Sequence, residues 1–120
     1  MVGSDGQQPR IDYVELPSLT AHELTRAFYA KAFGWEFTDY GPDYSATTNG
    51  TTDIGLNGTP EDSISAPLPV IRVTGLESFA DAVVKAGGII AKPIFAFPGG
   101  RRFHFIDPSG SELAVWETTE

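Results

Sequence analysis

The sequence contains no cysteine. This absence excludes thiol nucleophiles, thiolate-ligated zinc, iron–sulfur clusters and disulfides. The longest apolar runs are too short to cross a bilayer, and the first residues lack the basic and apolar regions of a signal peptide. We therefore expect a cytoplasmic protein with no membrane partner.

Positive charge is also scarce. The chain has 8 Lys and Arg against 16 Asp and Glu, which gives a net charge of −8. Such a field repels a phosphate backbone and argues against nucleic acid as a partner. It would favour a cationic small molecule in an acidic cleft, but acidity that serves solubility is the commoner explanation.

What the sequence does contain is enough for one packed domain. Its 120 residues are 41% hydrophobic and include eight Phe, four Tyr and two Trp. A chain of this length builds one core and has no room for a second. We expect a polar, glycine-rich tail at residues 1–9 and a single domain over residues 10–120.

Two segments repeat the same order of elements. In each, a strand precedes a helix that begins at a Thr-x-x-Glu capping box, Thr20 with Glu23 and Thr74 with Glu77. The helices end at glycines, and the landmarks of the two segments are offset by 54 residues. This register predicts an internal duplication. Module one covers about residues 10–58, and module two covers about residues 67–117.

Strands are expected on both sides of each helix. In module one they span 11–16, 35–40, 44–48 and 51–56, and the last two are joined by a type I′ turn at Asn49-Gly50. The helix between the first two presents Leu24, Phe28 and Ala32 on one apolar face. In module two the strands span 68–73, 89–97, 101–106 and 112–117, with a type I turn at residues 107–110.

This arrangement predicts the α+β class. Two βαβββ modules, each with one main helix, would form a cup-shaped, partly open mixed sheet, because twisted sheets curve. Side chains alternate along a strand, so Tyr13, Glu15 and Trp116 are expected to face the cup. A concave face that carries aromatic and charged side chains is where a small ligand binds.

Several motifs in this order make the chain resemble a known family. They are Tyr-Val-Glu-Leu at 13–16, Ala-Phe-Tyr at 27–29, Phe-Gly-Trp at 33–35, Ala-Gly-Gly at 86–88 and Asp-Pro-Ser-Gly at 107–110. From residue 11 to residue 117 the chain resembles the vicinal-oxygen-chelate superfamily of glyoxalases, bleomycin resistance proteins and extradiol dioxygenases. Relatives with one such domain often pair, so the resemblance also implies a homodimer.

Active relatives usually hold a divalent metal with one His, Gln or Glu from each of four strands. The resemblance places these positions at Tyr13, Gly55, Leu68 and Ala114. Gly, Leu and Ala cannot bind a metal, and a Tyr alone does not hold one. The resemblance thus implies a protein that has no metal or other cofactor and binds a small organic molecule, aromatic or cationic, in the cup.

Two alternatives stay open. One is an enzyme of the same superfamily, a lyase, isomerase or oxygenase, with Glu15 or Glu112 as general base or with a metal held by other ligands. The other is an interaction module whose sheet face only forms a dimer or docks a partner.

The expected ligand-binding residues are mainly aromatic. They are Tyr13, Trp35, Phe103, Phe105 and Trp116, which could clamp a planar or cationic ligand, together with Glu15 and Arg72. The same aromatic residues could equally form the core or a dimer interface. Arg72 could equally pair with Glu15 and only neutralise the floor of the cup.

The two histidines are expected to lie outside the cup. His22 falls in the first turn of a helix and is predicted to be solvated. A pairing of Phe103 with Ala114 would put the Phe side chains in the cup and His104 on the other face. A one-residue bulge would reverse this facing.

Overall fold

The computed structural model describes residues 9–119 except 49 and 63. The described residues form two compact units, one of residues 12–68 and the other of residues 69–119 with residues 9–11. We call them module one and module two, and we assign a strand that crosses a boundary to the unit that holds most of its residues. In this part of the chain, neither helix has the length and apolar character needed to span a bilayer.

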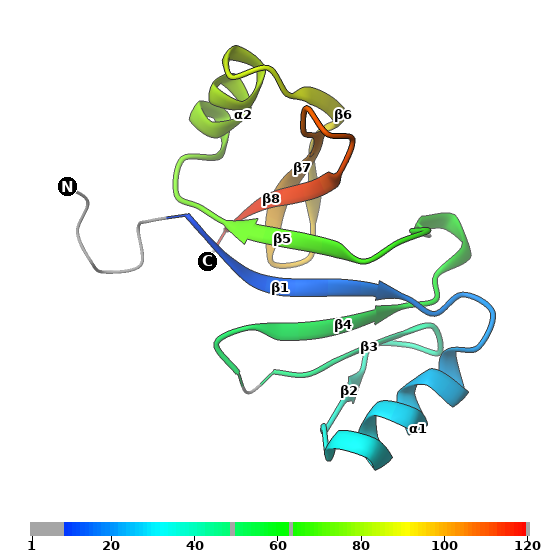
Figure 1. The fold of residues 1–120 in the computed structure, drawn as a ribbon. Coiled ribbons are helices and arrows are strands. Elements are labelled where there is room, and N and C mark those ends of the chain that lie inside the picture. The colour runs from blue at the N-terminus through cyan, green and yellow to red at the C-terminus, as the bar shows by residue number, and fades with distance from the viewer. Residues whose placement is uncertain (1–8, 49, 63, 120) are drawn as a thin grey trace. The chain divides into compact units, whose positions relative to one another are not determined.

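Module one contains one helix and a four-stranded sheet (Figure 1). Its elements are β1 (Arg10–Pro17), α1 (His22–Phe33), β2 (Thr38–Asp39), β3 (Tyr44–Ala46), β4 (Asp53–Asn57) and a short 3₁₀ helix (Pro60–Asp62). The strand order is β2-β3-β4-β1. β1 pairs with β4 in parallel, and the other neighbours are antiparallel.

Module two has the same topology. Its elements are β5 (Leu68–Arg72), α2 (Leu76–Lys85), β6 (Ile89–Phe97), β7 (Gly100–Ile106) and β8 (Glu112–Thr118). The strand order is β5-β8-β7-β6, again with a parallel pair between first and last strands and antiparallel pairs elsewhere. The predicted α+β class with two βαβββ modules is confirmed.

The apolar core of module two lies between its sheet and α2. Val73, Leu76, Phe103 and Val115 are buried there, and half-buried apolar residues of α2 such as Phe79 pack against them. Phe103 and Leu76 are both 0% exposed. Removing so large a buried side chain from a well-packed core costs about 3–5 kcal/mol, so this contact fixes the helix against the sheet.

The helix ends agree with the glycine pattern. Gly34 follows α1 with φ 73°, and its N–H donates to the carbonyl of Ala30. After α2, Gly87 has φ 107°, and the N–H of Gly88 donates to the carbonyl of Val83 at 2.8 Å. Glycine adopts this left-handed backbone without a Cβ clash, which is why it ends helices.

The predicted capping boxes are wrong. The N-cap residues are Ala21 and Gly75, and neither helix has a side-chain hydrogen bond from its cap. The start of α2 is capped by a side chain of β8. Glu117 Oε1 accepts from the N–H groups of Gly75 (3.0 Å) and Leu76 (3.1 Å). A carboxylate at this place satisfies orphan donors and complements the helix dipole.

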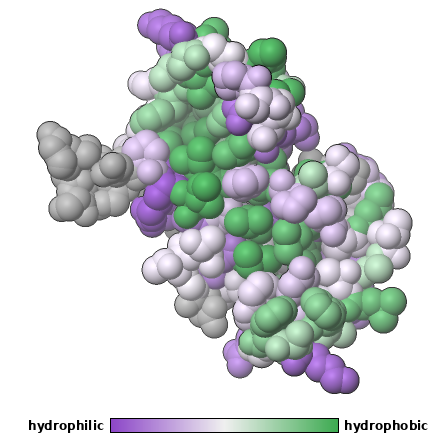
Figure 2. All heavy atoms as spheres, viewed as in Figure 1, coloured by the Kyte–Doolittle hydropathy of each residue, from purple (hydrophilic) through white to green (hydrophobic). Residues whose placement is uncertain are grey.

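The predicted apolar face of α1 is also wrong as a core face. Leu24 is 76% exposed and Phe28 58% exposed, and no described residue of α1 is buried. Figure 2 shows apolar side chains at the surface over α1. The helix is held instead by polar contacts, which include His22 with Ser45.

Two local predictions in module one need correction. The expected strand at 35–40 is only Thr38–Asp39. A two-residue turn at 49–50 would pair Ala46 with Asp53, whereas Ala46 pairs with Gly55, so the connection between β3 and β4 is longer. Asn49, the first residue of the predicted turn, lies outside the described residues.

The turn between β7 and β8 is confirmed and carries one further residue. The N–H of Gly110 donates to the Asp107 carbonyl at 2.9 Å, and Asp107 Oδ1 accepts from the N–H groups of Ser109 (2.8 Å) and Ser111 (3.0 Å). Gly110 has φ 95°. A type I turn followed by a left-handed residue is the common three-residue hairpin loop with a bulge.

This bulge shifts the register by one residue and overturns the predicted facing. Phe103 pairs with Val115, and His104 pairs with Ala114. Directly paired residues share a face, so Phe103 and Phe105 point toward the α2 core, where both pack. His104 lies on the opposite face with Ala114.

The cap at Glu117 yields a stability prediction. Glu117→Ala should lower the free energy of unfolding by about 1–2 kcal/mol, because it leaves two helix N–H groups without their acceptor. Glu77→Ala is the matched control: Glu77 also pairs with Arg101, at 2.7 Å, but is exposed, and such pairs contribute less than about 1 kcal/mol. Urea unfolding of both variants measures the difference. Equal losses would contradict the capping role.

Candidate functional site

The face of the module-two sheet opposite α2 carries cationic, aromatic and imidazole side chains. Pairing between strands sets its side chains in rows, because paired residues lie side by side. One row holds Arg72, Trp116, Arg102 and Phe95, and the next holds Val70, Ala114, His104 and Lys92. Cationic and aromatic groups therefore alternate along the first row of this surface, which we call the module-two face.

Guanidinium groups stack on aromatic rings in the first row. The Arg72 guanidinium carbon lies 5.1 Å from the centre of the Trp116 ring. That of Arg102 lies 5.4 Å from the Phe95 ring and 5.7 Å from the Phe97 ring. Distances under about 6 Å are typical of attractive cation–π contacts. The stacks hold both arginines flat against the face.

His104 is the most buried polar residue of this face, at 1% exposed. Its Nδ1 lies 2.8 Å from Glu112 Oε2. A carboxylate only accepts hydrogen bonds, so Nδ1 carries the proton and Nε2 carries a lone pair. Burial lowers the pKa of His104, as do the charges of Arg102 and Lys92, while Glu112 opposes them. The imidazole is therefore a neutral acceptor at neutral pH.

Module one places a buried carboxylate on the face opposite its α1 contact. Glu15 is 3% exposed. Its Oε2 accepts from the Tyr44 hydroxyl at 2.9 Å, and its Oε1 accepts from Asn57 Nδ2 at 3.2 Å. The Tyr13 and Tyr44 hydroxyl oxygens are 2.5 Å apart. Burial, and next the charge of Glu15, raise the pKa of Tyr44, so this hydroxyl keeps its proton and donates it.

Gly55 makes room for this cluster. It pairs with Glu15 across β1 and β4, and a Cβ at Gly55 would collide with the hydroxyl groups of both Tyr13 and Tyr44. The residue is therefore fixed as glycine by the space that the tyrosines occupy.

A second polar cluster of module one lies on the α1 side. His22 Nδ1 is 2.7 Å from Ser18 Oγ, and its Nε2 is 3.1 Å from Ser45 Oγ. Ser45 donates its single proton to Asp39 at 2.6 Å, so it must accept from His22 Nε2. His22 is half-buried and hydrogen-bonded, which corrects the prediction that it is solvated.

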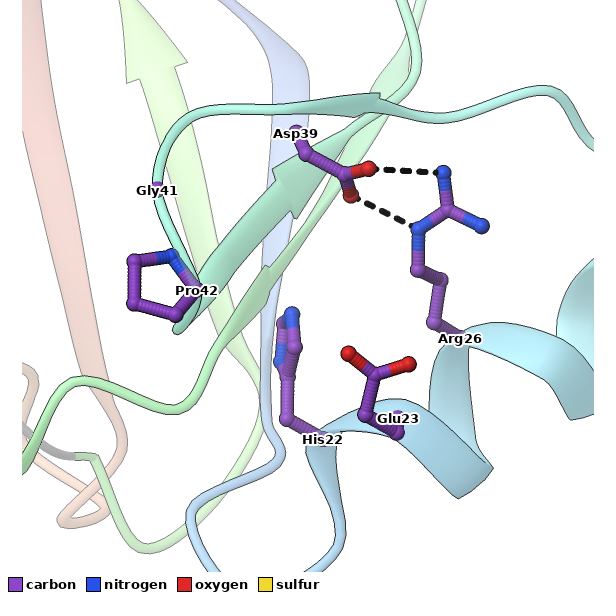
Figure 3. Close-up of a pocket in the computed structure, with 6 residues that line it drawn as sticks. All are labelled: His22, Glu23, Arg26, Asp39, Gly41 and Pro42. Carbon is purple, nitrogen blue, oxygen red and sulfur yellow. Dashed lines mark hydrogen bonds and ion pairs between the residues drawn. The ribbon is translucent and has the colours of Figure 1, made fainter.

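Figure 3 shows the shallow pocket of about 300 Å³ beside this chain of hydrogen bonds. His22, Glu23 and Arg26 reach into it from the first turns of α1, opposite Asp39, Gly41 and Pro42. Arg26 makes a two-pronged contact with Asp39 at 2.7 and 3.1 Å. Ser45 and Arg26 both lower the pKa of Asp39. Because these groups satisfy one another, the cluster serves to fasten α1 to β2 and β3.

The predicted ligand-binding residues separate into four places. Tyr13 and Glu15 meet through Tyr44 in module one, and Arg72 stacks on Trp116 in module two. Phe103 and Phe105 belong to the α2 core. Trp35 stacks on Tyr29 at 5.1 Å, near the end of α1 and outside any strand. The predicted pair of Glu15 with Arg72 stays a prediction.

Sequence reasoning missed Tyr44 and Asn57, and it placed His104 on the wrong face. Tyr44 and Asn57 face each other in the β3–β4 pair. Asn57 stands two residues from Gly55 on β4, and this alternation was a usable signal for the face that it shares with Gly55. His104 depended on one residue in a turn, which periodicity alone does not resolve.

The family model for the Glyoxalase/Bleomycin resistance protein/Dioxygenase superfamily matches residues 10–115. The chain belongs to this superfamily. Comparison with curated protein sequences gives no match.

Solved structures of the superfamily share the fold at low identity. Methylmalonyl-CoA epimerase from Mycobacterium tuberculosis is 12% identical with TM-score 0.71, over 100% of this chain and 94% of that chain. A superfamily member from Vibrio splendidus 12B01 is 17% identical with TM-score 0.66, over 92% and 99%. The Mn(II)-bound glyoxalase from Novosphingobium aromaticivorans is 19% identical with TM-score 0.63, over 92% of this chain but only 38% of that chain.

The residues at the family's four metal positions do not fit a metal ion. The space at Gly55 is filled by tyrosine hydroxyls, and Leu68 and Ala114 are buried apolar residues at 3% and 0% exposed. The Tyr13 hydroxyl is hydrogen-bonded to the Tyr44 hydroxyl. Within the described ranges, no three His, Asp or Glu side chains lie close enough together to hold a metal.

His104 yields a pH prediction. Its native pKa lies below the unfolded value of 6.5, so between these values the unfolded state binds more protons. The free energy of unfolding should therefore fall as the pH drops from 6.5 toward the lowered pKa, and the contribution should be complete above 6.5. Urea unfolding at several pH values should show a flatter profile for His104→Gln, with His22→Gln as control. A His104→Gln profile that matches the wild type would contradict this.

Proposed function

We propose that this superfamily member binds a small organic molecule with an aromatic or planar part on its module-two face. The observation that carries the proposal is the pair of stacks, Arg72 on Trp116 and Arg102 on Phe95. Stacked rings and guanidinium planes, half-buried and adjacent, offer the flat contact area that planar ligands use.

The four positions that lack metal ligands support a binding role that needs no metal. A metal ion that acts as a Lewis acid finds no ligand set at the four positions, which are Tyr13, Gly55, Leu68 and Ala114. The family's metal-assisted steps therefore have no support here. A homodimer, which the resemblance implies, and the absence of nucleic-acid and membrane partners stay predictions.

The test is a thermal-shift screen of small aromatic compounds on the purified chain. A ligand that binds only the native state raises the midpoint, by about 2.7 kcal/mol of stability at 100 times its dissociation constant. Trp116→Ala should abolish the shift of any hit. Trp35→Ala is the matched control. Trp35 is the second of the two Trp residues of the chain, and it lies in module one. A shift unchanged by Trp116→Ala would place the ligand elsewhere, and a screen without hits would contradict the proposal.

A second candidate function is cofactor-free proton transfer by Glu15. The observation that favours it is the buried carboxylate held by Tyr44 and Asn57. Such donors orient a carboxylate, and an oriented base contributes about 10²–10⁴-fold to a rate. Glu112, the other predicted base, is 44% exposed at its side chain and already bonded to His104. We therefore favour Glu15.

This candidate predicts that Glu15→Gln lowers kcat by at least about 100-fold on any substrate found for the chain. Glu112→Gln is the control and should keep most of the activity. The two variants are compared in single-turnover and steady-state assays, with circular dichroism to verify folding. Unchanged turnover in Glu15→Gln would remove Glu15 as the base.

A further inference from the structure

The outward side of α1 is apolar and exposed. Leu24, Ala27, Phe28 and Ala32 are all exposed, and their spacing of three and four residues puts them on one side of the helix. Such a stripe is typical of a helix that packs against another surface, but module one leaves it uncovered. The outward residues form what we call the α1 face: Glu23, Leu24, Ala27, Phe28, Lys31 and Ala32.

The apolar patch continues to the end of the helix. The ring centroids of Phe28 and Phe33 are 6.4 Å apart, and these rings are 58% and 62% exposed. A buried aromatic side chain covers about 150–250 Å², so each ring still offers roughly 90–150 Å², and Leu24, at 76% exposed, adds a similar area. A standard interface takes about 800 Å² from each partner and is most apolar at its centre. The patch is therefore large enough for the centre of a small interface.

The charges of the α1 face are complementary to those of a second copy. Glu23 and Lys31 are the exposed charged residues of α1, and each lies four residues, about 6 Å along the axis, from Ala27. If a second copy crosses antiparallel at Ala27, Glu23 of each copy lies opposite Lys31 of the other. The antiparallel order also brings opposite ends of the two helix dipoles together.

The apolar residues fit the same crossing. Leu24 stands three residues before Ala27, and Phe28 stands one residue after it. In the antiparallel pair, Leu24 of one copy and Phe28 of the other are therefore separated by two residues along the axis, about 3 Å. Ala27 has a small side chain at the crossing, and small side chains let helix axes approach closely.

The charge of the chain does not select a basic partner for this face. The chain carries −8, but the α1 face has one exposed charge of each sign. Repulsion between the remaining charges of two copies is screened beyond about 8–10 Å at physiological ionic strength. A locally neutral, apolar face with opposite charges at its two ends fits its own copy better than a basic surface.

We propose that two copies of this chain pair through their α1 faces across a two-fold axis. The helices cross antiparallel at Ala27, and Leu24 of each copy packs beside Phe28 of the other. The two-fold axis repeats each contact, so a change in one residue alters the interface twice. This inference goes beyond the proposed ligand function, because α1 belongs to module one and the proposed ligand face belongs to module two.

Sedimentation equilibrium of the full chain tests the pairing. Over total concentrations from about 1 µM to 1 mM, we expect the average mass to rise from that of one chain toward that of two. The expected dissociation constant is about 1–100 µM, because small interfaces are weak. A chain that remains monomeric at about 1 mM overturns the proposal.

Variants locate the interface. Leu24→Gln and Phe28→Gln should each raise the dissociation constant at least about 30-fold, as expected for a central apolar residue that is altered in both copies. Val84→Gln is the matched control, because Val84 is an exposed apolar residue of α2, at 54% exposed, and should leave the constant unchanged. Circular dichroism verifies folding. A dimer that is unaffected by both α1 variants overturns the proposed surface.

Charge reversal tests the antiparallel order. Glu23→Lys alone and Lys31→Glu alone each place like charges opposite one another at both ends, and each should raise the dissociation constant about 3- to 10-fold. The double variant exchanges the two charges and should restore most of the affinity. Two single effects that add in the double variant, with no restoration, overturn the antiparallel crossing.

A second readout needs no variant. Backbone amide NMR signals of residues 23–32 should shift as the protein concentration rises through the dissociation constant, while those of α2 should stay in place. Shifts confined to other parts of the chain overturn the α1 face as the interface.

Discussion

The pairing of β7 with β8 is the contact on which both faces of module two depend. Side chains alternate along a strand, so a shift of one residue exchanges the two faces. The turn at residues 107–111 sets the register, because Asp107 holds two backbone N–H groups and Gly110 adopts φ 95°. With this register Phe103 completes the apolar core, and His104 reaches the polar face.

The two modules keep their helices in different ways. α2 packs Leu76 and its apolar neighbours against the sheet, and Glu117 satisfies its first N–H groups. α1 buries no described residue and is tied by His22 with Ser45 and by Arg26 with Asp39. The two modules share one topology, but their helices are held differently. Apolar burial holds α2 in module two, and polar contacts have a larger part in holding α1 in module one.

The features that sequence predicts well are local. The helix ends at Gly34 and Gly87 and the turn at Asp107 follow from backbone preferences of single residues. The cap of α2 was missed because Glu117, which accepts from the N–H of Gly75, lies 42 residues from it along the chain. The Tyr44 bond to Glu15 likewise spans 29 residues. Such partners depend on strand pairing, which propensity and periodicity do not specify.

The candidate site shows the same division. Alternation along a strand predicted that Tyr13 and Glu15 share a face, and both join the Tyr44 cluster. It failed for Phe103 and Phe105, because the bulge at Gly110 adds one residue to the loop. The capping pattern also gave no sign that His22 would bond to two serines, since Ser18 and Ser45 come from separate elements.

Net charge of the chain is a poor guide to the ligand of one face. Interactions between exposed charges are screened beyond about 8–10 Å at physiological ionic strength, so a bound molecule senses mainly the nearest groups. Arg101 pairs with Glu77 and Glu117 on the α2 side, and the charges of Arg102 and Lys92 act on His104. Their charges oppose protonation of His104. Burial, the largest cause, and these charges together favour the neutral imidazole, and only a neutral imidazole can accept a hydrogen bond at Nε2.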